Sequence, residues 1–336
     1  MNKDIIILGI ESSCDDTSAA ILKNNNFLSN IIANQEIHTK YGGVVPELAS
    51  RAHQKNIVPV IHEALRIAKI DKSEIDAIAY TRGPGLMGSL LVGGSFAKGF
   101  SLALNKPLIS VNHMQGHILS HFINNNLYNP PKFPFLCLTV SGGHTQIVLV
   151  KDFLDMSVIG QTIDDAAGEA FDKSAKVLGL DYPGGPLIDK FSKDGNNNAF
   201  NFAKPKIKNL DFSFSGLKTS IMNLINNEKS KNSNFISENL EDLCASIQHS
   251  IVNILLEKIK LASLNTGIKN IAIAGGVSAN SYLRDQLLKL NSFNVYIPKF
   301  EYCTDNAAMI AVAGYYKFLN KELGNLKETS SARLNF

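Results

Sequence analysis

Short apolar, β-branched runs alternate with longer amphipathic stretches along the whole chain, which predicts strands and helices in mixed order. Two apolar runs, 5–10 and 134–140, each lead into a small polar turn and then into a second apolar run, which predicts two hairpins. The turns are 11–16 and 141–144. A repeat about 130 residues apart is far too long for a solenoid, whose period is roughly 20–50 residues. The pattern therefore predicts two related lobes, each offering one loop to a ligand in a cleft between them.

The remaining periodicity predicts an α/β fold. Helical spacing of apolar residues predicts helices over 46–68, 88–104, 113–121, 167–178, 239–264 and 307–319, and apolar runs predict strands at 77–80, 108–111, 271–274 and 294–297. The polar stretches 193–211 and 226–238 predict surface loops, and the last ~15 residues are expected to be frayed. We expect lobe I to comprise 1–118 plus 306–330, and lobe II to comprise 119–305.

Composition narrows the class of protein. The 336 residues are 45% hydrophobic, which is ample for two domains. A net charge of +3 permits nucleic-acid binding but is smaller than a dedicated nucleic-acid binder would carry. Four cysteines without a CxxC pair, and an N-terminus that leads directly into a strand, predict reduced thiols in a cytoplasmic protein. The stretch 89–104 contains Lys98 and several glycines, and we expect it to be too short and too polar to span a membrane.

Two histidines in one predicted helix are candidate metal ligands. His113 and His117 are four residues apart, so both rings can reach one ion, although two ordinary solvated histidines would fit the spacing as well. His121 lies about 12 Å along the axis from His113 and is expected to be structural or at the surface. The intervening residues include no glutamate, so this is not the HExxH protease pattern. For a third ligand we select Asp305, whose alternative is a helix cap; two His and one carboxylate suit Fe(II) or Zn.

Glycine turns offer candidate contacts to a nucleotide. Gly142 and Gly143 lack a Cβ, so backbone amides there can approach a bound anion closely. The run 275–280 predicts a strand, a Gly-Gly turn and a helix start, whose flat backbone could accept an adenine while Asn280 supplies amide contacts. Glycine turns after strands are common, so this motif is weak by itself.

Two acids complete the candidate nucleotide site. Asp172 and Asp189 flank the rigid turn 182–186, and carboxylates suit ribose hydroxyls. Each acid alone is more often a surface residue. Together with the two hairpin turns and the Gly-Gly helix start, they describe a nucleotide cleft between duplicated lobes.

Eight motifs in this order resemble one known family, the tRNA threonylcarbamoyladenosine transferases. They are GIESSCDDTSAAI, GGVVPELASRAH, HMQGH, SGGHTQ, GEAFDK, YPGGP, AGGVSAN and CTDNAAMIA, and they run from about residue 7 to 315. Each is unspecific alone, whereas the ordered set is highly specific. The resemblance implies duplicated actin-like (ribonuclease H-like) lobes. It also implies an acyltransferase that moves threonylcarbamoyl from its adenylate to N6 of adenosine 37 in tRNAs reading ANN codons, with AMP as the leaving group.

The resemblance also implies roles for particular residues. It implies that His113, His117 and Asp305 hold one divalent metal, Fe(II) or Zn, and that Asp15 lies at the reacting end as a base or an orienting group. The implied substrate-binding positions are Thr139, Val140, Ser141, Gly142, Gly143, Asp172, Gly185, Asp189 and Asn280. Asn112 stands where many bacterial members have a second histidine, a departure that concerns the orientation of the ligands and not their number.

The implied partners are tRNA, threonylcarbamoyl-AMP, a non-catalytic paralogue and a small ATPase, with a separate synthetase making the adenylate and no membrane involved. Three other functions stay open. A kinase or ATPase of the same fold would release phosphate in excess of any transfer. A metalloprotease, after the family's former label of O-sialoglycoprotein endopeptidase, would need the two histidines for cleavage. A scaffold that only binds the paralogue would tolerate loss of Asp305.

Overall fold

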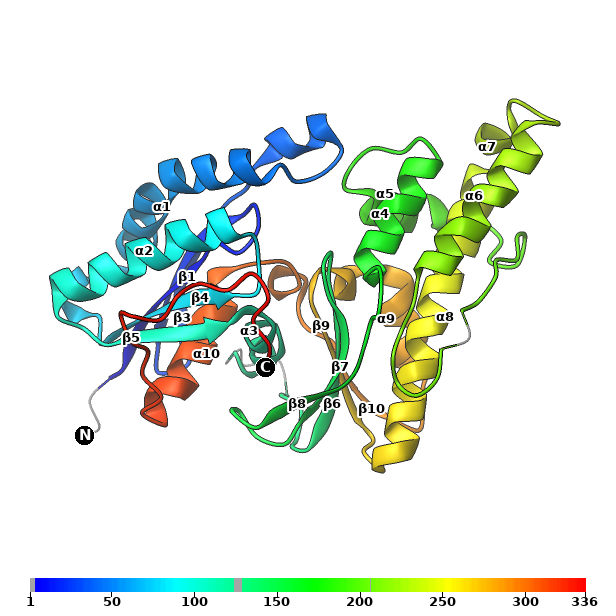
Figure 1. The fold of residues 1–336 in the computed structure, drawn as a ribbon. Coiled ribbons are helices and arrows are strands. Elements are labelled where there is room, and N and C mark those ends of the chain that lie inside the picture. The colour runs from blue at the N-terminus through cyan, green and yellow to red at the C-terminus, as the bar shows by residue number, and fades with distance from the viewer. Residues whose placement is uncertain (1–3, 124–128, 206) are drawn as a thin grey trace. The chain divides into compact units, whose positions relative to one another are not determined.

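The computed structural model describes residues 4–123, 129–205 and 207–336, and the chain forms two compact units (Figure 1). Unit 1 comprises Met1–Pro130 and Lys299–Phe336, and unit 2 comprises Pro131–Pro298. The sequence analysis placed the boundaries between the lobes at 118/119 and 305/306. The boundaries between the two units lie instead at 130/131 and 298/299.

Ring contacts explain where unit 1 ends. Phe122 lies 6.2 Å from Tyr316 between ring centroids, in the helix that closes the unit. The ring centroids of Phe27 and Tyr302 are 6.3 Å apart, so Tyr302 also packs against unit 1. The segments on either side of the expected divisions therefore pack within unit 1.

Unit 1 is built on a five-stranded sheet in the order β3-β2-β1-β4-β5. Its strands are β1 Ile6–Glu11, β2 Thr17–Lys23, β3 Asn26–Ala33, β4 Ala77–Gly83 and β5 Leu108–Asn112. The first three form an antiparallel meander, whereas β4 and β5 run parallel to β1. The helices are α1 Pro46–Ala68, α2 Met87–Leu104, α3 His113–Leu119 and α10 Ala307–Leu319. Because α1 and α2 cover one face and α10 the other, β1 is buried along its whole length, as its apolar sequence requires (Figure 1).

Unit 2 repeats this plan in the order β10-β9-β6-β7-β8. Its strands are β6 Phe135–Val140, β7 Thr145–Val150, β8 Met156–Gln161, β9 Asn270–Ala274 and β10 Asn294–Tyr296. Its helices are α4 Ala167–Val177, α5 Gly184–Phe191, α6 Ser215–Lys229, α7 Phe235–Glu238, α8 Leu240–Thr266 and α9 Ser281–Leu288. Again three antiparallel strands are followed by two parallel ones. The predicted duplicated α/β fold is confirmed.

Three expectations for individual elements differ from the structure. No strand was expected where β8 forms, because this outer strand is only partly buried and its sequence lacks a clean alternation. The stretch 226–238 is not all loop, since α6 continues to Lys229 and α7 follows. The helix expected over 113–121 ends at Leu119, and His121 lies in the following 3₁₀ turn, Ser120–Phe122, where it is buried. Of its two expected positions, structural or at the surface, the structural one holds.

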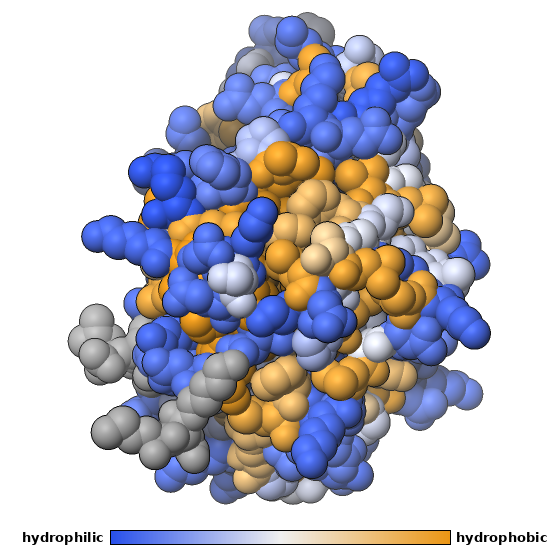
Figure 2. Space-filling model, turned by 90° about the vertical axis from the view of Figure 1, so that its left-hand side faces the viewer, coloured by the Kyte–Doolittle hydropathy of each residue, from blue (hydrophilic) through white to orange (hydrophobic). Residues whose placement is uncertain are grey.

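The apolar helix α2 also departs from expectation. By length and composition it could cross a membrane, with a mean hydropathy of 1.3 over 18 residues, so the stretch is not too polar for that test. In the structure α2 packs against α1 and β4, with Leu90 and Ala97 buried. Its other side leaves Leu91 and Leu102 exposed, and Figure 2 shows apolar surface gathered on the side of the molecule that carries these helices.

The C-terminal residues are not frayed. After α10 the chain returns along unit 1, where the Gly324 amide donates to the Leu108 carbonyl over 2.7 Å and the Ser331 amide to the Arg82 carbonyl over 3.0 Å. We call residues 324–335 the C-terminal strap. The expectation failed because the strap is held mainly through its own main-chain amides and carbonyls. Every residue carries these groups, so the contacts produce no recognisable pattern of side chains in the sequence.

Candidate functional site

The start of α3 places both candidate histidines on one buried face. Asn112 ends β5 and caps the helix, with its Oδ1 accepting hydrogen bonds from the amides of Met114 at 2.9 Å and Gln115 at 3.3 Å. His113 and His117 then lie one turn apart, both buried, with ring centroids separated by 4.7 Å. The prediction that one helix presents the two rings together is confirmed.

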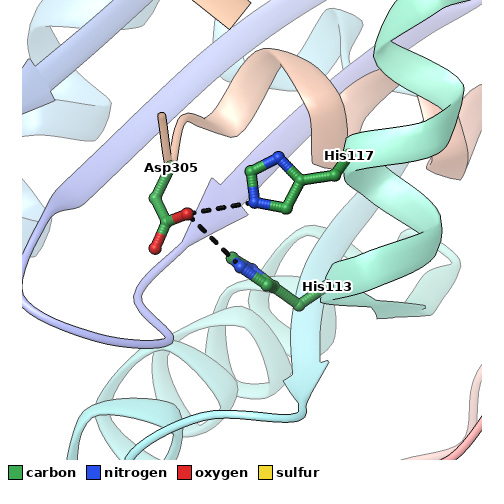
Figure 3. A group of neighbouring side chains, drawn as sticks. All are labelled: His113, His117 and Asp305. Atoms are coloured by element: carbon green, nitrogen blue, oxygen red, sulfur yellow. Dashed lines mark hydrogen bonds and ion pairs between the residues drawn. The ribbon is translucent and has the colours of Figure 1, made fainter. Parts of the chain in front are cut away.

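Asp305 reaches the same point from the other end of the sequence. Its Oδ1 lies 3.3 Å from His113 Nε2 and 3.1 Å from His117 Nε2 (Figure 3). The alternative interpretation of Asp305 as a helix cap is wrong, because Asn306 caps α10 by accepting from the Met309 amide at 3.1 Å. One ligand atom from each of the three residues lies within 4.8 Å of the others. The expected convergence is therefore present.

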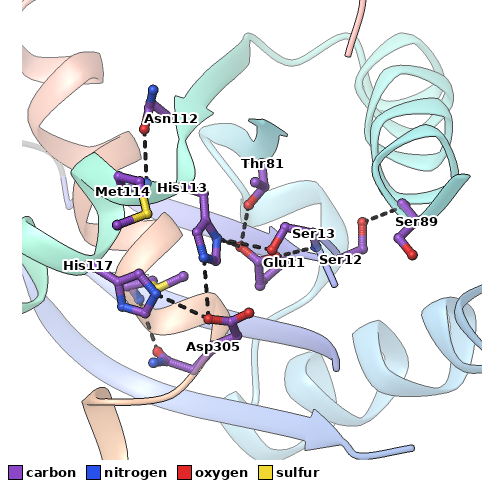
Figure 4. Close-up of polar contacts among 12 residues, drawn as sticks. Glu11, Ser12, Ser13, Thr81, Ser89, Asn112, His113, Met114, His117 and Asp305 are labelled. Carbon is purple, nitrogen blue, oxygen red and sulfur yellow. Dashed lines mark hydrogen bonds and ion pairs between the residues drawn. The ribbon is translucent and has the colours of Figure 1, made fainter. Parts of the chain in front are cut away.

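Glu11, at the end of β1, fixes the ring of His113. Its Oε2 lies 3.0 Å from His113 Nδ1 and accepts from the Thr81 hydroxyl at 2.5 Å, while its Oε1 accepts from the Ser13 amide (Figure 4). The Ser13 hydroxyl also lies 3.1 Å from His113 Nδ1. With Nδ1–H directed at Glu11, Nε2 of His113 is the nitrogen that faces Asp305. This is the arrangement in which a carboxylate orients a metal-ligating histidine.

The two histidines differ in charge preference. Burial would lower the pKa of His113, but the carboxylates of Asp305 and Glu11 hold it well above its usual value. Burial lowers the pKa of His117. For Asp305 the effect of burial is outweighed by His113, whose proximity lowers the pKa of the carboxyl. Asp305 is thus ionised and His117 neutral, which are the forms that bind a cation.

The donor set fits a divalent ion. Two imidazole nitrogens and one carboxylate oxygen form the set that zinc and non-haem iron use when they keep open positions. Two ligand atoms that are each about 2.1 Å from one ion at a tetrahedral angle are about 3.4 Å apart. The observed separations of 3.3 and 3.1 Å from the Asp305 oxygen to the two imidazoles agree with that value.

Asp15 lies in the turn that joins β1 to β2. Neighbouring helices hold this turn, because the Ser89 hydroxyl donates to the Cys14 carbonyl at 2.9 Å and His53 Nε2 lies 3.0 Å from the same oxygen. Asp15 is half-buried there. Its neighbour Asp16 has a pKa raised to about 7, first by burial and then by Asp15, Asp305 and Glu11. Asp305 thus acts electrostatically on this turn, through Asp16.

In unit 2 the predicted glycine turn is exposed. The Ser141 amide donates to the His144 carbonyl at 2.8 Å, which closes the turn between β6 and β7. Gly142 and Gly143 are exposed, and open space surrounds the position of a Cβ at each. Gly168, in the first turn of α4, packs against this turn, and its amide donates to the Ser141 carbonyl at 3.2 Å.

The predicted ribose acids bind backbone amides. Asp172 follows Gly168 by one turn of α4, and its Oδ1 accepts from the amides of Gly184 at 2.8 Å and Gly185 at 3.2 Å. It therefore caps α5 and is not a loose surface acid. The carboxylate of Asp189, on α5, accepts from the Ser281 amide at 3.1 and 3.2 Å.

Asn280 completes this series of contacts. Its Oδ1 caps α9 by accepting from the Leu283 amide at 2.9 Å, and its Nδ2 donates to Gln248 Oε1 at 2.6 Å. Thr139 and Val140 are buried at the end of β6. The unit 2 candidates thus lie along one chain of contacts from the glycine turn through α4 and α5 to α9, although several of their polar atoms already have protein partners.

A family model described as tRNA N6-adenosine threonylcarbamoyltransferase matches residues 26–312. A curated protein of that name from Christiangramia forsetii is 59% identical and covers 100% of this chain and 99% of its own length. Another from Riemerella anatipestifer is 61% identical and covers 98% of each chain.

The chain belongs to the tRNA N6-adenosine threonylcarbamoyltransferase family.

The threonylcarbamoyltransferase assignment makes this chain a transferase with tRNA as its substrate. Solved structures agree with the actin-like fold. Full-length HypF in its phosphate- and nucleotide-bound form aligns with a TM-score of 0.59 at 13% identity, over 93% of this chain and 46% of that one. The activator of 2-hydroxyisocaproyl-CoA dehydratase from Clostridium difficile, with bound ADPNP, aligns with a TM-score of 0.53 at 14% identity, over 96% and 99%.

Sequence reasoning missed Glu11 and Ser13 as neighbours of the candidate metal ligands. Both belong to the first motif of the chain, GIESSCDDTSAAI, from which only Asp15 was selected. The available signal was a carboxylate directly after the apolar run 5–10, since a buried acid at a strand end needs partners. The identity of its partner, His113, is a property of the tertiary structure.

Proposed function

We propose that this transferase moves a threonylcarbamoyl group from threonylcarbamoyl-AMP to N6 of adenosine 37 in tRNAs reading ANN codons, with dependence on one divalent metal. The observation that carries the proposal is the convergence of His113, His117 and Asp305 on one point, with Glu11 behind His113. The family assignment supports the reaction type.

His113, His117 and Asp305 would hold Fe(II) or Zn, which when bound can polarise a carbonyl or phosphoryl oxygen. Glu11 binds the Nδ1 side of His113, so that Nε2 would be the nitrogen that holds the ion. The buried surroundings of the rings limit competition by water. These residues therefore orient the ligand set and maintain its protonation state.

In the transfer, N6 of adenosine forms a bond to the carbamoyl carbon, and the bond from that carbon to the phosphate oxygen breaks to release AMP. N6 must lose one proton. Asp15, half-buried in the turn beside Ser13, is our candidate to accept that proton or to orient the amine. An anticodon loop presents splayed bases, so unstacking the target base costs little.

The nucleotide part of the donor would bind in unit 2. Gly142 and Gly143, which follow Ser141 in the exposed turn, leave open space in which phosphate oxygens can approach the backbone. The remaining proposed contacts are Thr139, Val140, Asp172, Gly185, Asp189 and Asn280. HypF, which has the same fold, was solved with phosphate and nucleotide bound, and this supports a nucleotide site here.

We further propose a cytoplasmic protein that works with a non-catalytic paralogue and a small ATPase, with no membrane involved. The apolar side chains exposed on α1 and α2, among them Val58, Leu91 and Leu102, support a protein partner at that face.

The test is reconstitution. The chain would be mixed with tRNA, threonine, bicarbonate, ATP, the synthetase and the two partners, and the tRNA nucleosides analysed by mass spectrometry. We expect threonylcarbamoyladenosine with wild type and a large loss with Asp305→Ala. No product from partners that are active with another family member would contradict the proposal.

The same reaction mixtures separate the other functions. A kinase or ATPase would release phosphate in stoichiometric excess over transferred threonylcarbamoyl. A scaffold would give unchanged product with Asp305→Ala. A metalloprotease would cleave a protein substrate only while His113 is intact.

A further inference from the structure

The C-terminal strap runs across unit 1 and ends at the metal-ligand helix. It is the red segment of Figure 1, which passes β5 and β4 and ends beside α3. At its end the Asn112 side chain donates from Nδ2 to the carbonyls of Leu334 at 3.4 Å and Asn335 at 3.1 Å. The strap is therefore joined to the residue that precedes His113.

Asn112 uses both ends of its amide. Its oxygen caps α3 by accepting from the amide of Met114 (Figure 4) and from that of Gln115, while its nitrogen donates to the strap. Only an amide side chain offers an acceptor and two donors at such short reach. The orientation of the Asn112 side chain therefore depends on the strap. Because Asn112 caps α3, it also influences the orientation of the next residue, His113.

A second set of contacts leads from the strap to the same ring. The Gly85 amide donates to the Ala332 carbonyl at 3.3 Å, and the next amide, of Leu86, donates to the Ser13 carbonyl at 2.7 Å. The Ser13 hydroxyl lies 3.1 Å from His113 Nδ1. Two independent routes, through Asn112 and through Gly85, thus connect the strap to His113.

The strap is firmly anchored upstream of these contacts. Arg82 Nε donates to the Thr329 carbonyl at 3.0 Å, and the Lys98 ammonium donates to the Glu328 carbonyl. Arg82 also lies 3.7 Å from the Glu328 carboxylate. A segment fixed in this way can restrain the residues it meets at its end.

We propose that Asn112 is a positioning residue for His113. The C-terminal strap, acting through Asn112 and through the contacts of Gly85 and Leu86, holds His113 in the orientation that binds the ion. The inference rests on the metal centre of the proposed function and adds a distant segment of the chain to it. Asn112 does not contact the ion. Its effect is on the direction of His113 Nε2 relative to Asp305.

The test measures Co(II) binding, because Co(II) reports both affinity and ligand geometry in its visible absorption. Asn112→Ser keeps a neutral capping oxygen on α3 and removes Nδ2, the atom that donates to the strap. A chain that ends at Arg333 removes the two acceptors instead. Asn239→Ser is the matched control, since Asn239 also donates from Nδ2 to a main-chain carbonyl, that of Phe235 at 2.8 Å, at a helix start in unit 2.

We expect Asn112→Ser and the shortened chain each to weaken Co(II) binding by about 10-fold or more, the usual effect of losing an orienting contact behind a ligand. Both should change the Co(II) absorption bands, and Asn239→Ser should change neither quantity. Both changes remove the same interaction, the contact between Asn112 and the end of the strap. Combining them should therefore weaken Co(II) binding little beyond the effect of either change alone.

The outcomes that would contradict the proposal can be told apart from a failure of the metal centre itself. Unchanged affinity and bands in a folded Asn112→Ser protein would overturn it, even if the shortened chain unfolds. Fully additive losses in the combined variant would also overturn it, since the two changes would then act separately. If wild type bound no Co(II), the metal centre itself would fail, and with it the basis of this inference.

Discussion

At the scale of single residues, the two histidines are held differently. His113 has polar partners at both nitrogens, with Glu11 and Ser13 at Nδ1 and Asp305 at Nε2. His117 faces Asp305 with Nε2, and its buried Nδ1 has no hydrogen-bond partner among the described residues. The direction of His113 therefore depends on polar contacts, and that of His117 on packing.

Glu11→Gln should weaken divalent-metal binding by about 10-fold to 100-fold, because an amide no longer fixes the His113 proton on Nδ1 as a carboxylate does. The dissociation constant can be measured by competition with a chromophoric chelator. Glu47→Gln, on the exposed start of α1, removes an equal charge from the same unit and serves as the control. Equal affinities for Glu11→Gln and wild type would show that Glu11 does not orient the ring.

Asp16 should make the metal-free protein less stable as pH rises. Its pKa in the fold is about 7, raised above the ordinary 3.8 by burial and by Asp15. The unfolded chain therefore gives up this proton at lower pH than the folded chain does. The resulting stability is fully present below about pH 4 and is lost as pH rises through about 7.

The measurement for Asp16 is the free energy of unfolding in urea at pH 5 and pH 8 in the presence of a chelator. Asp16→Asn should lose less stability over this interval than wild type does. Equal losses would show that Asp16 titrates near its ordinary pKa.

At the scale of elements, the candidate residues lie where strands end. β1 leads to Ser13 and Asp15, β5 to His113, β6 to Ser141, and β9 to the Gly275–Gly276 turn. Gly275 has φ 89°, and a Cβ there would meet the Val140 carbonyl. That turn therefore needs glycine both for its backbone conformation and for its close approach to β6.

Gly275→Ala should lower the free energy of unfolding by about 1–3 kcal/mol, through backbone strain and the contact with Val140. Gly276→Ala, one residue later, is the matched control, because open space surrounds the position of its Cβ and its φ is not left-handed. Both values come from urea denaturation. Similar destabilisation by the two variants would contradict this account of the turn.

At the scale of the whole molecule, the two kinds of candidate site belong to different units. His113, His117, Asp305 and Glu11 all lie in unit 1, whereas the proposed nucleotide contacts from Thr139 to Asn280 all lie in unit 2. Each unit has its own hydrophobic core. Metal binding should therefore add to the stability of the folded protein without any nucleotide present.

Saturating Zn or Fe(II) should raise the melting temperature of wild type, since a ligand at 100 times its Kd stabilises the native state by about 2.7 kcal/mol. A chelator should reverse the shift. His117→Ala should show no metal-dependent shift, measured by calorimetry under the same conditions. A shift that persists in His117→Ala would assign the stabilising ion to another place.

The sequence by itself determined the elements whose signals are local. The helix from Pro46 to Ala68 and the last helix, Ala307–Leu319, were predicted within a residue because their apolar spacing and their start signals lie within the elements themselves. The two hairpin turns followed from the same local reasoning. His113 and His117 were paired by helical spacing alone, and the family was recognised from the order of its motifs.

Only the tertiary structure decided which distant groups meet. His117 and Asp305 are 188 residues apart, and nothing in local spacing measures the distance between them. The strap was expected to be loose because backbone carbonyls, which every residue carries, hold it to Asn112. Glu11 could be noticed as an acid after a buried strand, but its partner His113 was set by the pairing of β1 with β4 and β4 with β5. Contacts of this kind depend on chain topology, and the sequence patterns report only neighbours along the chain.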